Sequence, residues 1–146
     1  MAVARFERFF REAAGLDVDK SDLKRYRDFV HAKLYDLLLI GVTNAKANGR
    51  DVVQRADLPV TKGLRECVHA FRRLDEEIEL QPILHAMATR PLLDMPLADE
   101  VESQLPELAG GLSVALARSF KQIDPSVKNP QSNHWERAFA LFDLLL

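Results

Sequence analysis

The chain has 146 residues, of which 47% are hydrophobic and 29% are charged, as in an ordinary globular domain. Its 20 basic and 22 acidic residues give a net charge of -2. Proteins that coat DNA are usually strongly basic, because the neutralisation of phosphates supplies most of their affinity. The composition therefore excludes strong DNA coating and allows only weak, salt-sensitive DNA binding through local clusters.

The charges are unevenly placed along the chain. Residues 1–80 carry 15 basic and 14 acidic side chains, a net of +1, whereas residues 81–146 carry 5 and 8, a net of -3. A single cysteine, Cys67, excludes an intrachain disulfide and fits a reducing compartment. No apolar run is long enough for a membrane helix, and the N-terminus lacks a signal-peptide pattern. We therefore expect a cytoplasmic protein without a membrane partner, located at the nucleoid if it binds DNA.

Two helices are predicted at the start of the chain. Phenylalanine and alanine side chains recur at helical spacing up to Gly15, which predicts a short amphipathic helix that ends there. Asp19 can cap the next helix, and no proline interrupts residues 20–48. A helix of that length would be roughly 42 Å long. It needs packing partners along both of its halves.

A very short strand and a third helix are predicted next. Asn48-Gly49 is a good helix stop, and the β-branched pair Val52-Val53 favours a strand-like piece over residues 51–55. A lone strand leaves unpaired amides, so a second strand piece is expected to pair with it or with a loop. The third helix is expected to begin at Asp57, with Pro59 in its first turn.

The second half repeats this order about 75 residues later. It predicts a short helix over 82–88, a long run from about Asp94 to Ile123, a strand-like piece over 126–128 and a last helix over 131–146. Pro106 predicts a kink or short break in the long run. The side chains expected to be buried on the last helix are Trp135, Phe139, Phe142 and Leu145.

The sequence AKANGR over 45–50, followed by Asp57, resembles an archaeal-type histone, and this resemblance extends over roughly 6–71. In histones, the arginine after the second helix pairs with an aspartate at the start of the third. Arg50 and Asp57 have that order and spacing. The whole chain, including the tail LFDLLL and the segment DPSVKNPQ, resembles a bacterial family with two histone folds in one polypeptide.

The resemblance implies an all-α protein in which two histone folds, about 1–78 and 79–146, form one compact domain. By this resemblance the chain is a monomeric pseudodimer whose two long helices cross and whose strand pieces pair with loops of the opposite half. Glycine permits close approach of helix backbones. We therefore expect Gly110 or Gly111 at that crossing, near residues 34–38. The alternative is a locally weakened, exposed helix.

Arg50 and Asp57 are expected to be a structural ion pair rather than a binding site. In the second half, the matching positions are about Asp124 and Gln131, so no ion pair is expected there. The sequence departs from histones at two other places. Asp51-Val52 replaces a Lys-Thr pair that faces phosphates, and Ala47 replaces a histidine that joins archaeal histone dimers.

Six basic residues are candidate contacts for DNA phosphates. Arg5, Arg8 and Arg11 lie at i, i+3 and i+6, so they share one face of the first helix. In histone-like proteins this helix and the neighbouring loops meet phosphates, and the lysines that could join the arginines are Lys20, Lys24 and Lys128. The alternative is an ordinary solvated helix face interleaved with Glu7 and Glu12.

The sequence contains no motif for catalysis, a cofactor or a metal. We therefore expect a non-enzymatic histone-fold protein. One role is nucleoid-associated, with weak, sequence-independent binding to double-stranded DNA. The alternative is a histone-fold module that binds another protein and not DNA. A helical protein that binds a small ligand or a metal ranks third.

Overall fold

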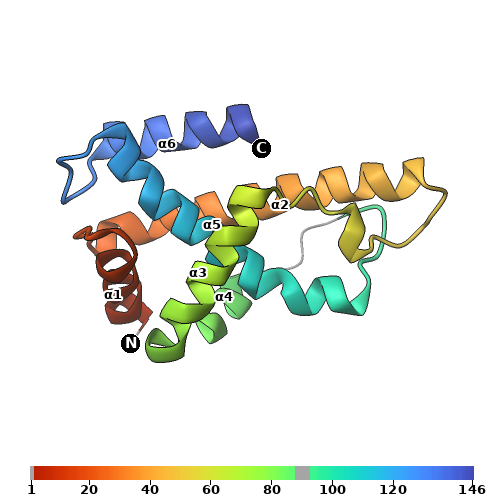
Figure 1. Ribbon diagram of the computed structural model, residues 1–146, viewed down its shortest axis with the longest axis horizontal. Helices are drawn as coiled ribbons and strands as arrows, with labels where there is room; N and C mark the ends of the chain where they lie inside the picture. The colour runs from red at the N-terminus through yellow and green to blue at the C-terminus, as the bar shows by residue number, and fades with distance from the viewer. Residues whose placement is uncertain (1, 88–92) are drawn as a thin grey trace.

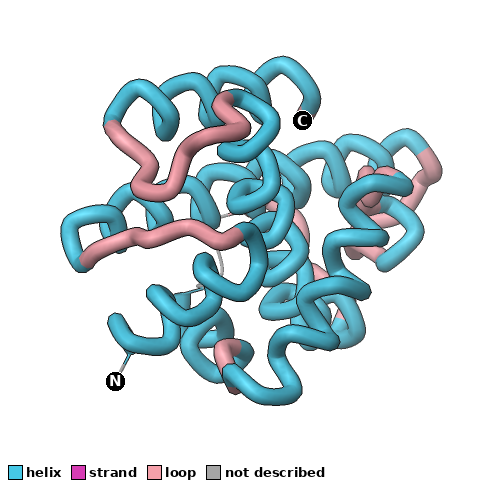
Figure 2. Tube along the Cα trace, turned by 60° about the vertical axis from the view of Figure 1, so that its left-hand side comes forward, coloured by secondary structure: helices cyan, strands magenta, loops and turns pink. Residues whose placement is uncertain are grey.

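The computed structural model of the protein describes residues 2–87 and 93–146. As predicted, the protein is all-α, and Figure 2 shows helices joined by loops, with no strand in the residues described. Two 3₁₀ helices, η1 (Lys20–Asp22) and η2 (Arg55–Asp57), precede longer elements. The α-helices are α1 (Ala2–Ala14), α2 (Leu23–Ala47), α3 (Lys62–Ile78), α4 (Gln81–Met87), α5 (Asp99–Ile123) and α6 (Ser132–Leu145).

Helix α5 lies at the centre of the molecule and contacts the other five α-helices (Figure 1). Its middle section, residues 108–114, is buried throughout, so this helix supplies the central part of the core. The two long helices, α2 and α5, cross in Figure 1. No helix among the described residues is long and apolar enough to cross a membrane.

A buried aromatic cluster joins α1 to the crossing of α2 and α5. The ring of Tyr26 on α2 lies 5.2 Å from that of Phe6 and 5.5 Å from that of Phe10, both on α1. Such aromatic pairs contribute about 0.5–1.5 kcal/mol each beyond their buried area. The Tyr26 hydroxyl lies 2.7 Å from the Ser113 hydroxyl on α5, so the buried polar ends of the two side chains satisfy each other.

The predicted strand pieces are loops that pair across the two halves of the chain. Val53 forms a parallel bridge with Leu97, in which its amide donates to Pro96 and its carbonyl accepts from Ala98. At the other end of the molecule, the Asp17 amide donates to the Lys128 carbonyl at 2.6 Å. The predicted pairing with loops is therefore present at both ends. The predicted strands are wrong, because each pairing is too short to form one.

Several predicted helix boundaries are wrong for local reasons. Helix α3 begins at Lys62 rather than at Asp57, because Leu58 is extended and the Thr61 hydroxyl caps the helix by accepting from the Leu64 amide. Helix α5 begins at Asp99, after the segment that pairs with Val53.

Helix α5 continues through Pro106, so of the predicted kink or short break the break is absent. One further prediction for the second half is wrong. On α6, Trp135 is buried and Phe139 and Phe142 pack against the core, but Leu145 is 79% exposed. Leu145 lies in the last turn of the helix, beyond the part that covers α2 and α5.

Gly110 and Gly111 mark a close helix contact, but their partner is α3 and not α2 near residues 34–38. A Cβ on Gly110 would lie within 3.0 Å of the Phe71 ring, and one on Gly111 would lie 3.2 Å from the backbone nitrogen of Val68. The larger side chains Tyr26 and Ser113 connect α2 with α5 instead. The predicted close approach is therefore correct, and the predicted crossing partner is wrong.

We predict that Gly110→Ala destabilises the protein by about 1–3 kcal/mol, because the new methyl group has no room against the buried Phe71 ring. Urea unfolding followed by circular dichroism measures this loss. Gly63→Ala on α3 is the control, since its nearest neighbour is the Thr61 hydroxyl at 4.0 Å. It should leave stability unchanged or raise it by up to about 1 kcal/mol. Equal effects of the two substitutions would contradict the prediction.

Candidate functional site

Arg50 and Asp57 form the predicted ion pair at the end of α2, between Nη2 and Oδ1. The Asp57 side chain is only 3% exposed, and its Oδ2 accepts the Gln54 amide at 2.8 Å. The Asp57 carbonyl accepts from the Asn44 side chain, also at 2.8 Å. Every polar group of Asp57 is therefore engaged with loop or helix. This arrangement fixes the corner and leaves no polar group of Asp57 for a ligand, in agreement with the structural role that was predicted.

A second polar corner, which was not predicted, joins Asp124 and His134. The two side chains lie 3.1 Å apart, and His134 Nδ1 accepts the Gln131 amide at 2.9 Å. The Ser126 amide and hydroxyl also bind the Asp124 carboxylate. As expected, Asp124 makes no ion pair with Gln131. Its partner is His134, whose Nε2 donates to the Asp124 carboxylate because His134 Nδ1 already accepts the Gln131 amide.

The two corners place different polar groups at matching positions. Asp57 and His134 occupy the same place, the third residue of a capping box that begins at Gln54 or Gln131. The preceding partner is the cation Arg50 in one corner and the anion Asp124 in the other. The two partners lie seven residues apart in the first corner and ten residues apart in the second. Counting seven residues from Asp124 therefore leads to Gln131 and not to His134.

The three arginines of α1 contact groups of the protein itself. Arg5 donates to the carbonyl of Glu79 at 3.2 Å, just beyond the end of α3. Arg8 pairs with Glu77 at 3.4 Å and with Glu12 at 3.5 Å. Arg11 lies 4.0 Å from Asp17. These contacts tie α1 to the acidic end of α3 and reduce the positive charge that the helix offers to a phosphate.

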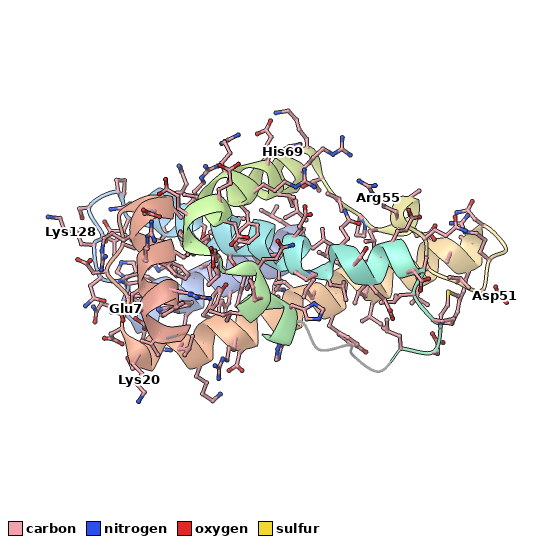
Figure 3. The ribbon with its side chains drawn as sticks, turned by 90° about the horizontal axis from the view of Figure 1, so that it is seen from below. Glu7, Lys20, Asp51, Arg55, His69 and Lys128 are labelled. Atoms are coloured by element: carbon pink, nitrogen blue, oxygen red, sulfur yellow. The ribbon has the colours of Figure 1, made fainter. Side chains whose placement is uncertain are left out.

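The candidate lysines lie at the end of the molecule where the loop before η1 meets the loop before α6. Figure 3 shows Lys20, Lys128 and Glu7 at this end, with Asp51 at the far end. Lys20 and Lys128 are exposed and make no ion pair with any described residue. Lys24 is paired with Asp28 at 2.9 Å. The structure thus brings two uncommitted lysines to the end of the molecule that also holds α1 and its arginines.

Six large apolar side chains are exposed among the described residues, three on α2 and three on α6. Leu144 is 80% exposed and Leu145 is 79% exposed. The others, which are between 38% and 44% exposed, are Tyr35, Leu39, Ile40 and Leu141.

A buried cation holds the end of α6 on α2. The Lys33 ammonium binds Asp143 on α6 and Asp36 on α2, and its side chain is only 5% exposed. Burial by itself would lower the pKa of Lys33, but the hydrogen bonds to both carboxylates outweigh burial and raise the pKa above its usual value. The charged lysine is therefore the stable form. It places the exposed leucines of α6 beside α2.

Metal and thiol chemistry find little support in the described residues. They contain no group of three or more metal-binding side chains. Cys67 is half-buried, and burial raises the pKa of its thiol, which disfavours the reactive thiolate.

We predict that Asp57→Ala destabilises the protein by roughly 3 kcal/mol, because it leaves the half-buried Arg50 guanidinium without its partner and the Gln54 amide without an acceptor. Thermal or urea unfolding gives the value. Asp51→Ala, which removes an exposed carboxylate from the same loop, should change stability by less than about 0.5 kcal/mol. Similar losses in both variants would show that the corner is not a clamp.

We also predict a change in acid unfolding for Asp124→Asn. The hydrogen bond from the Ser126 hydroxyl, and then that from His134, hold the pKa of Asp124 below its ordinary value of 3.8. The resulting stability is fully present above that value and is lost as the pH falls through the lowered pKa of the folded protein. The variant should therefore be less stable than the wild type near neutrality, and the two should converge in acid. Stability curves that stay parallel down to the acid limit would contradict this.

The chain is similar to several known proteins. Two proteins of Aquifex aeolicus strain VF5, both named "Uncharacterized protein", match it. One is 31% identical over 133 residues, which are 85% of this chain and 80% of that protein. The other is 25% identical over 118 residues, which are 81% of this chain and 69% of that protein.

Two crystal structures resemble the fold. A protein from Thermus thermophilus is 56% identical, with a TM-score of 0.87 and complete coverage of both chains. A protein from Aquifex aeolicus, solved at 1.9 Å, is 22% identical, with a TM-score of 0.86 over 99% of this chain and 95% of that one. The second similarity concerns the fold alone. Residues 6–143 match the family described as "Domain of unknown function (DUF1931)", and the chain belongs to that family.

Proposed function

We propose that the chain consists of two histone folds that form an intramolecular pseudodimer. The order of elements supports this, because a short helix, a long helix and a further helix occur twice. The long helices α2 and α5 have 25 residues each. The loop that follows each of them pairs with the loop that precedes the other. The two corners add a second sign of the repeat, since each is built on a capping box.

Within this architecture, we propose that the protein is a non-enzymatic module that binds another protein. The observation that carries this proposal is the set of exposed apolar side chains on α2 and α6, with Leu144 and Leu145 about four-fifths exposed. Uncovered apolar groups of this kind are typical of surfaces that contact a partner. The α1 arginines offer weaker support for the DNA-binding role, because each already contacts a carbonyl or carboxylate.

We predict that Leu144→Ser/Leu145→Ser abolishes the capture of a protein partner without loss of stability, because both side chains lie outside the core. Quantitative mass spectrometry of proteins retained by the immobilised chain measures this. Ala140→Ser, at an exposed position on the same helix, is the matched control and should retain the partner. If all three chains retain the same proteins in the same amounts, the apolar surface is not the binding site.

Weak binding to double-stranded DNA is the second candidate. It is supported by Lys20 and Lys128, which are exposed at one end of the molecule where two loops pair. The affinity for duplex DNA should fall with salt, and Lys20→Gln/Lys128→Gln should reduce the logarithmic salt slope by roughly 1.8 for two lost phosphate contacts.

Fluorescence anisotropy with labelled duplex DNA across a salt series tests this second role. The control, Arg5→Gln/Arg8→Gln, should leave the slope unchanged, because these arginines already contact groups of the protein. Absence of binding at low salt, or an unchanged slope in the lysine variant, would exclude the paired loops as a DNA contact.

A further inference from the structure

We propose that a pocket between η2, α3 and α5 binds a small organic oxyanion, a carboxylate or phosphate ester that also carries a hydrogen-bond donor. This site is separate from the exposed apolar side chains of α2 and α6, and from the end of the molecule that holds Lys20 and Lys128. The proposal rests on the cavity, the charges around it and one polar atom that has no partner. It does not depend on the protein-binding role.

The pocket has a volume of about 560 Å³, within the range of small-molecule sites. Its apolar lining consists of Ala56 on η2, Val60 in the loop before α3, Val68 on α3 and Leu108 on α5. Val68 is the side chain against Gly111, so the close contact between α3 and α5 forms one wall. The lining is apolar enough for a short carbon skeleton, and it includes no phenylalanine, tyrosine or tryptophan ring.

The basic side chains of the pocket come from a stripe on α3 and from η2. Arg65, His69 and Arg72 follow one another at i, i+4 and i+7, which places them on one face of the helix. Arg55 reaches the pocket from η2. Figure 3 shows Arg55 and His69 on the same side of the molecule. The pocket therefore has three guanidinium groups and an imidazole around it.

Two of these guanidinium groups are free to bind an anion. The Arg72 Nε donates to Glu107 at 2.6 Å, so its charge is already balanced. Arg55 and Arg65 form no ion pair within the part of the chain that the structure describes. Glu100 also lines the pocket, yet it lies beyond ion-pair distance of both arginines. A guanidinium fork matches the geometry of carboxylate and phosphate oxygens, so these two arginines define the class of ligand.

The α5 side of the pocket specifies the second group of the ligand. The Oε1 atom of Gln104 is shielded from solvent and has no hydrogen-bond partner among the described residues. A shielded acceptor without a donor is unfavourable, because it has given up its hydrogen bonds to water. Gln104 lines the pocket, and a rotation of its amide would bring this oxygen to a hydroxyl or amide of the ligand while the anionic end binds Arg55 and Arg65. A hydroxylated carboxylic acid or a phosphorylated alcohol fits this description.

Isothermal titration calorimetry with citrate and with glycerol 3-phosphate tests the site, since both probes carry an oxyanion and a hydroxyl. The whole chain should bind at least one of them, and Arg55→Gln/Arg65→Gln should weaken that binding by roughly tenfold or more. Arg73→Gln, on the same helix but outside the pocket, should bind as the wild type does. Inorganic phosphate serves as a third probe that lacks the carbon-bound hydroxyl. Gln104→Leu should lower the affinity for whichever of the two hydroxylated probes binds and leave the affinity for inorganic phosphate unchanged.

The outcomes separate this site from nonspecific attraction and from DNA binding. If Arg73→Gln weakens binding as much as Arg55→Gln/Arg65→Gln does, the attraction comes from the general positive charge of the protein, and the proposal is overturned. So would the absence of binding for both probes at millimolar concentration. If Arg55→Gln/Arg65→Gln weakens binding of duplex DNA but neither small probe binds, the arginines contact a nucleic-acid backbone and the small-molecule site does not exist. Circular dichroism confirms that each variant is folded.

Discussion

The close packing of α3 on α5 is the contact on which the other features depend. Gly110 and Gly111 remove the side chains that would keep the helices apart, and Phe71 and Val68 occupy the space. Because α5 is held at the centre, the remaining helices pack around it. The same contact places the arginine stripe of α3 beside the polar residues of α5. A substitution that widened this contact would therefore disturb the core and the pocket together.

The two ends of the molecule are built alike but with different polar partners. At one end the loop after α2 meets the segment before α5, and at the other the loop after α5 meets the segment before η1. One corner uses a buried aspartate with an arginine, and the other uses a histidine with an aspartate. Similar backbone geometry is thus compatible with different side-chain pairs. Similarity of fold alone is consequently a poor guide to what either end binds.

Structure that depends on residues close together in the sequence could be predicted better than contacts between residues far apart in it. The Arg50–Asp57 pair could be predicted from the resemblance of residues 45–57 to histones, in which an arginine and an aspartate pair in that order and at that spacing. Asp57 did not start α3, because the extended Leu58 and the Thr61 cap decide where the helix begins. The glycines indicated a close contact, yet nothing in their spacing identifies Phe71 as the partner. The arginine stripe over 65–72 could have been found from its helical spacing, but the unpartnered oxygen of Gln104 depends on the folded structure.

The buried Lys33 has a consequence for the last turn of the chain. Helix ends normally fray, and a frayed end must lose conformational freedom before it can serve as a binding surface. The ion pair with Asp143 fastens α6 immediately before Leu144 and Leu145. These two leucines therefore stand on a turn that is held against α2. In the protein-binding role proposed above, this restraint would lower the entropic cost of association, because less conformational freedom remains to be lost.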